Sequence, residues 1–467
     1  MFDVVFRGAR VIDPMNGFDA VADVAVKDGK IALVAPKIEE AGAKEYDYTG
    51  QVLQPGIIDS HVHLGEIWGS PYGFKMLAMC GVTTALDMAG PMDNVLGNIP
   101  TYGAGINTAI LQFASPPFTF KNNEPTKQEM EELIDKSMND GALGVKLLGG
   151  HYPLKPDVSS LLIKTALERS AYIAWHAGTS EHGSNIEGMR EAVEMSKGNF
   201  LHLAHINAYC RGAIRPEAVE TQEAIDMLLA NPHIHCESYV SPRNGTRLTC
   251  AEDGKIQSKV TGNCLRRFGF SEDREGVRAA LLANKAFVVY DAGGYSDLAT
   301  GEVGLKMWED ANSDVGGSFN VNPPVPRIWL AEAKRPDGSF VVDALSTDGG
   351  CIPRNVLLSQ GLSLVKLGVL TLPEYVAKTS LNAARMLRLE NKGHLTPGAD
   401  ADITIYDFET QTPIASFVMG QPVLKNGEVV GKGGTVICTE RGEKAIRERG
   451  LGCIVVDPAK KVERFIV

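Results

Sequence analysis

Histidine, lysine and aspartate side chains recur at the ends of apolar segments of this chain, where they can form a metal site. His61 and His63 end the segment Pro55-Gly-Ile-Ile-Asp-Ser-His-Val-His. Residues i and i+2 of a strand point to the same face, so the two imidazoles can bind one ion through their ring nitrogens. The segment becomes polar only at its C-terminal end, which is where a barrel of parallel strands carries its active site. We therefore interpret the pair as metal ligands.

A lysine stands inside another apolar segment. Lys146 lies within Gly144-Val-Lys-Leu-Leu. One interpretation is a barrel lysine that pairs with an acid. Burial suggests a second one, because a desolvated lysine has a lowered pKa, and its neutral amine can react with CO₂ to give a carbamate. That carbamate is an anion with two oxygens, and it can bridge two cations.

Three further candidate ligands follow in chain order. His176 ends Tyr172-Ile-Ala-Trp-His, His205 ends Leu201-His-Leu-Ala-His 29 residues later, and Asp348 closes the segment that begins at Val341. His202 lies an odd number of positions before His205, so we expect it on the opposite face of the strand. Six ligand-type side chains therefore end five expected strands, and this pattern predicts a metal centre.

The elements that must position these residues alternate between strand-like and helix-like patterns. Apolar segments and the helices between them repeat at about 30 residues from 146 onward, the size of a β-α step. Thr126 and Glu129 form a capping box ahead of an amphipathic helix over 127–139, and a second helix is expected from Ser159. The pattern predicts an α/β fold with a (β/α)₈ TIM barrel. The expected barrel strands are 54–63, 82–88, 108–114, 142–148, 171–176, 200–206, 233–239 and 341–346.

The two ends of the chain have the pattern of short, half-buried strands. Asn426-Gly427 between apolar runs indicates a hairpin. We expect residues 1–53 and 391–467 to form one small β-sandwich domain with a tail, and 54–390 to form the barrel domain. The interval 240–338 is too long for one β-to-α connection, so it must hold an insertion, with an extra strand over 286–290. The charged run in 440–467 is typical of a solvated helix face.

Charge and composition exclude several classes of protein. The 467 residues carry a formal net charge of −11, which argues against a protein that binds nucleic acid or an anionic membrane through a basic face. No apolar run approaches the ~20 residues of a membrane span, and no signal peptide is apparent. Eight cysteines without a CxxC pair favour reduced thiols. We expect a cytoplasmic protein.

The ligand order resembles that of the amidohydrolase superfamily: HxH on the first strand, Lys on the fourth, His on the fifth and sixth, Asp on the eighth. The resemblance covers nearly the whole chain, including Gly8-Ala-Arg-Val-Ile-Asp-Pro and Gly393-His-Leu-Thr-Pro-Gly-Ala-Asp. Lys146 looks like the carboxylated lysine of the dihydropyrimidinase, hydantoinase and dihydroorotase group. The spacing from His176 to His205 is similar to that of D-aminoacylases and of the amidohydrolase-like chain of formylmethanofuran dehydrogenase. D-aminoacylases bridge their metals with a Cys, and 111–116 contains none, so Lys146 is the better bridge.

This resemblance implies a mechanism. It predicts two divalent ions, and Zn²⁺ is the expected metal. One ion would be bound by His61, His63 and Asp348. The other would be bound by His176 and His205, with carboxylated Lys146 between the two ions. A metal-bridging hydroxide would attack a non-peptide C–N amide bond in a cyclic amide or ureide or in an N-acyl amino acid. Asp348 would move the proton, and Tyr152 is a candidate donor to the oxyanion. The candidate substrate-binding residues are Asn207, Arg211 and Arg243.

Two other functions stay open, and one statement on assembly follows from the resemblance. A deaminase of a heterocycle usually holds one metal and needs no barrel lysine, so Lys146 counts against it. Membership of a larger complex, like that of formylmethanofuran dehydrogenase, is the other alternative. The expected partners are a small-molecule amide substrate and further copies of the same chain in a homo-oligomer, with no nucleic acid and no membrane.

Overall fold

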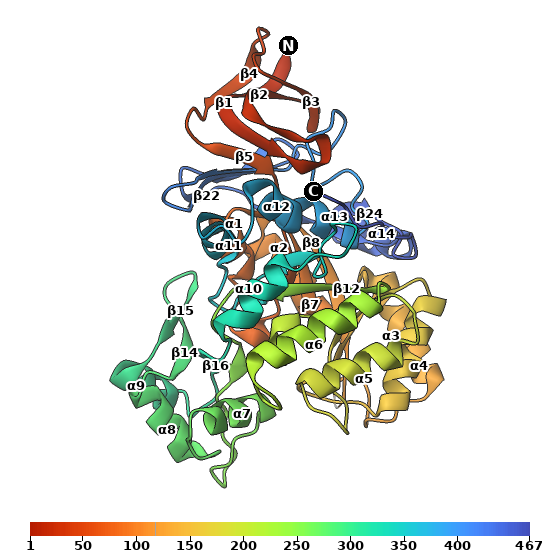
Figure 1. Ribbon diagram of the computed structural model, residues 1–467, viewed down its shortest axis with the longest axis vertical. Helices are drawn as coiled ribbons and strands as arrows, with labels where there is room; N and C mark the ends of the chain where they lie inside the picture. The colour runs from red at the N-terminus through yellow and green to blue at the C-terminus, as the bar shows by residue number, and fades with distance from the viewer. Residues whose placement is uncertain (117) are drawn as a thin grey trace.

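A ring of parallel strands forms the centre of the molecule, partly hidden behind helices in the view of Figure 1. The computed structural model describes residues 1–116 and 118–467. Neighbouring strands run parallel in the order β17-β12-β11-β10-β9-β8-β7-β6-β18. The strands at the two ends of this order, β17 and β18, follow each other in the chain, so the segment 344–350 pairs with β12 on one side and β6 on the other. The predicted α/β barrel class is confirmed. The barrel strands are β6 (Ile57–His63), β7 (Val82–Ala89), β8 (Ala104–Ala114), β9 (Gly144–Leu148), β10 (Tyr172–His176), β11 (Leu201–Leu203), β12 (Ile234–Tyr239), β17 (Ala344–Ser346) and β18 (Gly349–Gly350).

Helices cover the outside of this ring. The predicted capping box is present, because Thr126 accepts from the backbone of Glu129, and α3 starts at Lys127. The helix expected from Ser159 begins three residues earlier, at Pro156, since proline suits the first turn of a helix. Apolar residues of α3 to α6 pack on β9 to β12 and form one continuous core. The outer helices are α1 (Gly73–Met79), α2 (Met92–Tyr102), α3 (Lys127–Asp140), α4 (Pro156–Glu168), α5 (Ile186–Ser196), α6 (Glu217–Ala230) and α11 (Leu357–Lys366).

Both ends of the chain contribute to a second sheet, which is mostly antiparallel. Its strand order is β22-β21-β20-β19-β5-β1-β2-β3, with β4 on β1. The pairing of β5 with β19 joins the two halves, and the predicted hairpin at Asn426-Gly427 is confirmed by the pairing of Lys425 with Glu428. The domain limits 1–53, 54–390 and 391–467 stay predictions. The strands are β1 (Phe2–Asp13), β2 (Phe18–Lys27), β3 (Lys30–Ala35), β4 (Gly42–Asp47), β5 (Val52–Pro55), β19 (Ile403–Asp407), β20 (Thr412–Val418), β21 (Gln421–Lys425) and β22 (Glu428–Val429).

The C-terminal tail packs on the barrel. Strand β23 (Gly433–Cys438) pairs in parallel with β8 and with β24 (Gly452–Val455), so it extends the barrel sheet and not the terminal sheet. The charged run forms α14 (Glu440–Glu448), which buries Gly442 and Ile446 and exposes most of its charges. Between barrel and terminal sheet lie α12 (Leu372–Val376) and α13 (Asn382–Met386) (Figure 1).

The long interval between β12 and β17 contains a separate lobe, which we call the inserted lobe (residues 246–319; lower left in Figure 1). Its antiparallel sheet has the order β13-β16-β14-β15, and the strand expected over 286–290 is confirmed as β14. The lobe has its own apolar core around Leu248, Leu265 and Trp308. Its elements are β13 (Thr246–Arg247), α7 (Lys259–Arg267), α8 (Arg274–Leu282), β14 (Ala286–Asp291), β15 (Ser296–Ala299), α9 (Gly301–Asp310) and β16 (Gly316–Phe319), and α10 (Pro324–Glu332) leads back to the barrel.

Among the helices that the structure describes, none combines the length and the apolar character needed to cross a membrane.

Candidate metal centre

All six predicted ligands come together at the C-terminal ends of the barrel strands. Five of them line one cavity of about 530 Å³, and the sixth, His61, is fully buried beside them. Each ligand lies within two residues of the C-terminal end of its strand, so the parallel direction of the strands brings them to one edge of the barrel. The five cavity-lining ligands are His63, Lys146, His176, His205 and Asp348.

The first group of donors consists of His61, His63 and Asp348. One ligand atom from each lies within 4.8 Å of the others. Asp348 Oδ1 lies 2.9 Å from His63 Nε2 and 3.4 Å from His61 Nε2. Ligand atoms around a tetrahedral Zn²⁺ are separated by about 3.3 Å, given metal–nitrogen distances near 2.0–2.1 Å. Two neutral imidazoles and a carboxylate at this spacing fit a divalent cation.

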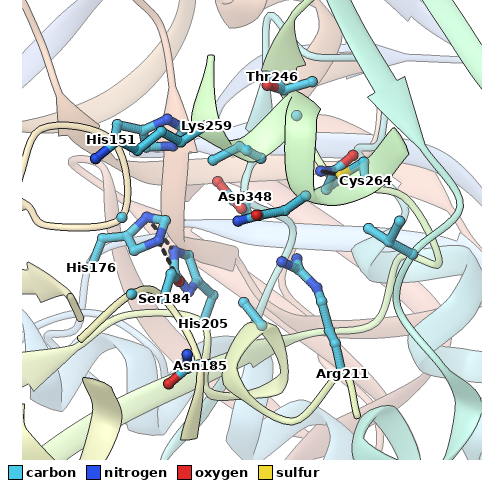
Figure 2. A pocket seen from close by; sticks show the side chains of 18 of the residues that line it. His151, His176, Ser184, Asn185, His205, Arg211, Thr246, Lys259, Cys264 and Asp348 are labelled. Carbon is cyan, nitrogen blue, oxygen red and sulfur yellow. Dashed lines mark hydrogen bonds between the residues drawn. The ribbon is translucent and has the colours of Figure 1, made fainter. Parts of the chain in front are cut away.

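The second group consists of His176 and His205, with Lys146 nearby. His205 Nε2 lies 3.1 Å from His176 Nδ1, as the dashed line in Figure 2 marks. The His205 ring also stacks on the ring of His61, with centroids 5.1 Å apart. Lys146 Nζ lies 3.1 Å from His61 Nε2 and donates to the Met88 carbonyl at 3.2 Å. The two groups therefore adjoin, with the lysine amine next to the first of them.

Burial sets the protonation of these groups. It lowers the pKa of all four imidazoles, so each is neutral and has a nitrogen lone pair for a metal. Burial also lowers the pKa of Lys146 to about 8, against the attraction of Asp348, Glu237 and Asp87. Burial alone would raise the pKa of Asp348, but the Arg354 guanidinium and His61 hold it well below its ordinary value. Asp348 is therefore a carboxylate, and the lysine amine is easily deprotonated.

Glu237 is a site residue that the sequence did not predict. It is fully buried on β12. Its Oε1 lies 2.6 Å from His61 Nδ1 and accepts from the His205 backbone N–H at 2.7 Å, while its Oε2 accepts from Ser346 Oγ at 2.5 Å. A carboxylate on Nδ1 leaves Nε2 of the same ring for a metal. The signal in the sequence is an acid within a buried strand between two ligand-bearing strands.

Backbone conformation helps to turn the ligands into the cavity. His205 and Asp348 have positive φ angles of 36° and 51°, a region that residues other than glycine rarely adopt and that is concentrated at functional sites. Gly150 packs against the His176 ring, because a Cβ added to it would lie 2.0 Å from Nε2. The ring is further held by Ser184, whose Oγ lies 2.8 Å from Nε2.

The candidate oxyanion donor lies at the edge of the site. Tyr152 is 38% exposed, and its ring packs edge-on against Phe118 at 5.1 Å. The described lining of the cavity includes its neighbour His151 and not Tyr152. The loop after β9 makes a turn, with Tyr152 N donating to Leu148 O at 2.8 Å, and beyond it the tyrosine ring packs on Phe118, outside the described lining. Its role as a donor stays a prediction.

The three candidate substrate-binding residues differ in their placement. Arg211 lines the cavity, and its guanidinium donates to Asn322 Oδ1 at 2.7 Å and to Tyr239 Oη at 2.8 Å. Asn207 is fully buried in a short 3-10 turn after β11, and its Oδ1 accepts from the Tyr239 backbone N–H at 3.0 Å. Arg243 lies outside the described lining, with its guanidinium 5.0 Å from the Phe287 ring centroid. Of the three, Arg211 alone is placed to meet a molecule in the cavity.

Two further residues complete the surroundings of the ligands. Arg354 is 3% exposed, and its Nη2 lies 2.8 Å from Asp348 Oδ2. The sequence contains no signal for this ion pair, except that Asp348 and Arg354 lie close together along the chain. The expectation that His202 lies on the opposite strand face from the ligands was wrong: it pairs in register with Ala174, which pairs with Lys146, so it lies on the same face, with Nδ1 2.8 Å from Tyr172 Oη. The bend after β11, where His205 has a positive φ, breaks the alternation of faces on which the expectation was based. It supports the strand and takes no place in the cavity lining that the structure describes.

Comparison with known proteins agrees with this architecture. The model of the family described as "Amidohydrolase family" matches residues 327–437. A dihydroorotase of Elusimicrobium minutum is 26% identical, over 87% of this chain and 88% of its own length. One chain of the formyltransferase/hydrolase complex Fhc of Methylorubrum extorquens is 24% identical, over 91% of this chain and 88% of its own length.

A solved structure extends the comparison to the fold. A D-aminoacylase crystal structure superposes with a TM-score of 0.65 at 18% identity, over 93% of this chain and 99% of the other. The barrel and the sheet built from both termini are therefore shared over almost the full length of both chains.

Proposed function

The chain belongs to the amidohydrolase superfamily, and on that premise we propose that it is a metal-dependent hydrolase of a non-peptide C–N amide bond. The convergence of six ligand-type side chains at the C-terminal end of the barrel, five of which line one cavity, carries this proposal. The chemistry of the donors supports it, because four neutral imidazoles, a carboxylate and a desolvated lysine suit divalent cations such as Zn²⁺.

The ligands divide between two positions. His61, His63 and Asp348 would hold one ion, and His176 and His205 the other. Lys146 would be a further ligand, placed between the two positions, after its amine reacts with CO₂. The amine is suited to this reaction because it is buried and its pKa is lowered to about 8. Divalent cations bound here would acidify a water molecule and polarise the carbonyl oxygen of an amide.

Asp348 is the proposed proton carrier. It is the one carboxylate among the cavity-lining residues that the structure describes. Its Oδ2 pairs with Arg354, which leaves Oδ1 directed toward His63 and the cavity. From this position Oδ1 can accept a proton from the attacking water and return it to the leaving nitrogen. Arg354 keeps the carboxylate ionised and in place and is a positioning residue.

The proposed substrates are cyclic amides or ureides and N-acyl amino acids. The similarity to a dihydroorotase supports the first class and the shared fold of a D-aminoacylase the second. Arg211 would bind a substrate carboxylate, Asn207 would position Tyr239 and β12 behind it, and Tyr152 would donate to the oxyanion after its side chain turns inward. Arg243 would act at the base of the inserted lobe. The cytoplasmic location and the homo-oligomer stay predictions.

The test is a hydrolysis screen with zinc-loaded protein on hydantoins, dihydropyrimidines, lactams and N-acyl-D-amino acids. We expect turnover of at least one class, loss of turnover in Asp348→Asn, and loss in Lys146→Ala with partial rescue by short carboxylic acids that replace the carbamate. An Asp348→Asn variant with full activity would contradict the role of the carboxylate.

A second candidate function is that of one component in a hydrolase complex of several different chains. The match to a chain of the Fhc complex over most of both lengths favours it. Co-purification of this chain with unrelated chains at a stoichiometric ratio would support this candidate. An active preparation that contains this chain alone would exclude it.

A further inference from the structure

The cavity extends well beyond the ligands and is strongly cationic. Its volume of about 530 Å³ lies within the range of about 300–1,000 Å³ typical for drug-sized ligands, so it can accept more than a simple cyclic amide. Asp348 is its one described acidic residue, although the whole chain carries a net charge of −11. The basic residues that line it are Lys146, Arg211, Arg247, Lys259, Arg266, Arg267 and Arg354.

One face of α7 forms the cationic wall of the cavity. Lys259, Asn263 and Arg267 follow each other at intervals of four and lie on one side of the helix, and all three line the cavity. On the neighbouring side, Leu265 is buried in the core of the inserted lobe. The direction of the cationic face is therefore set by the packing of the lobe.

Arg211 reaches the same cavity from the barrel. Figure 2 shows its guanidinium extended toward Asp348, with Lys259 on the other side of that residue. The two walls are in direct contact, because Arg267 donates a hydrogen bond to the Arg211 carbonyl. Barrel and lobe thus present basic groups to one space.

The cations of this cavity differ in whether they are neutralised. Arg354 pairs with Asp348, and Arg266 pairs with Glu272 at 2.6 Å. Within residues 1–116 and 118–467, no carboxylate lies within ion-pair distance of Lys259, Arg267 or Arg211. Three unneutralised cations around one concave site favour an anion there, because guanidinium groups bind carboxylates and phosphates in a forked geometry and an ammonium adds a point charge.

We propose that the inserted lobe selects substrates: Lys259 and Arg267 of α7, together with Arg211, bind an anionic group that the substrate carries away from its scissile amide bond. This rests on the proposed function and defines its substrate class as amides with a remote carboxylate or phosphate. A neutral substrate of the same length leaves the cationic wall solvated and gains nothing from it.

The kinetic test uses zinc-loaded full-length protein and three amides of equal length that end in a methyl, a carboxylate or a phosphate group. We expect a KM at least tenfold lower for one anionic substrate than for the neutral one, with a difference that shrinks as salt is added. Lys259→Gln and Arg267→Gln should each raise the KM of that anionic substrate about tenfold, the equivalent of one charge-assisted hydrogen bond. The kcat for that substrate and the KM of the neutral substrate should not change. The preferred end group identifies the anion.

Lys306→Gln is the matched control, because Lys306 lies on α9 of the same lobe, pairs with Asp310 and is absent from the described lining. Calorimetric binding of glutarate and of inorganic phosphate provides a readout that needs no turnover. Weaker binding of these anions by the two α7 variants than by the control supports the subsite even if no amide is hydrolysed. Anion binding without any hydrolysis would contradict the proposed function and leave the subsite standing. Equal kcat/KM for charged and neutral amides at low salt, with unchanged anion binding in both α7 variants, would overturn the subsite while leaving hydrolysis intact.

Discussion

Replacement of Glu237 by glutamine tests how the protein prepares His61 to bind a metal. The carboxylate lies 2.6 Å from His61 Nδ1 and also accepts from the His205 backbone N–H at 2.7 Å, through the same oxygen. Its other oxygen accepts from Ser346 Oγ at 2.5 Å. A glutamine with its amide oxygen toward the histidines and its NH₂ toward the serine keeps all three contacts, because the hydroxyl can turn and accept. Glu237→Gln therefore removes the charge and preserves the shape.

The expected consequence is a loss of metal affinity. A carboxylate that orients a ligating histidine and raises its basicity contributes about 10–100-fold to affinity, or about 1.4–2.7 kcal/mol. We expect Glu237→Gln to weaken Zn²⁺ binding by this factor in competition with a chromophoric chelator. His205 Nε2 is affected less, since Glu237 contacts the backbone of that residue and not its ring.

A matched control separates this effect from the loss of any buried carboxylate. Glu220 is also fully buried. It accepts from the backbone N–H groups of Gly212, Ile214 and Arg215 at 2.7, 2.8 and 2.9 Å and touches no predicted ligand. Glu220→Gln should lower stability and leave zinc affinity unchanged. An unchanged zinc affinity in Glu237→Gln, or an equal loss in both variants, would show that the Glu237 carboxylate does not prepare His61 to bind a metal.

Two other substitutions test the second ligand group and the C-terminal tail. Gly150→Ala places a Cβ 2.0 Å from His176 Nε2, so native mass spectrometry should find one zinc ion fewer per chain than in the unchanged protein. The control is Gly97→Ala, whose Cβ meets nothing within 4 Å and which should keep the full zinc content. Equal zinc content in the two variants would contradict the clash. Arg464→Gln removes the ion pair of the 5%-exposed Asp343 side chain at 2.7 Å but leaves His235 Nδ1 3.5 Å from it. It should lower the free energy of unfolding by about 3 kcal/mol at pH 7, the lower end of the cost of breaking a buried pair. Burial alone would raise the pKa of Asp343, but His235 and Arg464 hold it below its ordinary value, so this stabilisation is complete above about pH 4 and is lost as the pH falls further. Denaturant titrations of the two proteins should therefore converge below about pH 4, and a constant difference down to pH 2 would argue against the ion pair.

The convergence of the six candidate ligands could be predicted from the sequence because each lies in or just after the C-terminal half of a recognisable strand. A parallel barrel brings such ends to one edge, so the spacing of His61, Lys146, His176 and Asp348 along the chain was enough to place them together. Residue type and strand position therefore supported the prediction, without any knowledge of distances.

Other parts of the site depend on contacts that no local pattern encodes. Glu237 and His61 are 176 positions apart, and they meet because only the segment with β17 and β18 separates β12 from β6. The direction of Tyr152 depends on the turn after β9. The cationic face of α7 reaches the cavity only because the inserted lobe packs beside the barrel mouth, and the pairing of β23 with β8 likewise depends on the path of the tail.

On the proposed function, divalent ions bound by these six side chains are required for hydrolysis. The direct measurement is hydrolysis of the best amide from the screen by metal-free protein as zinc is added in known equivalents. We expect no turnover without metal and a rise in turnover that saturates at no more than two zinc equivalents per chain. This rise should be absent when His61 and His63 are replaced by alanine. Full turnover by metal-free protein, or an unchanged rise in the His61→Ala/His63→Ala variant, would contradict this requirement.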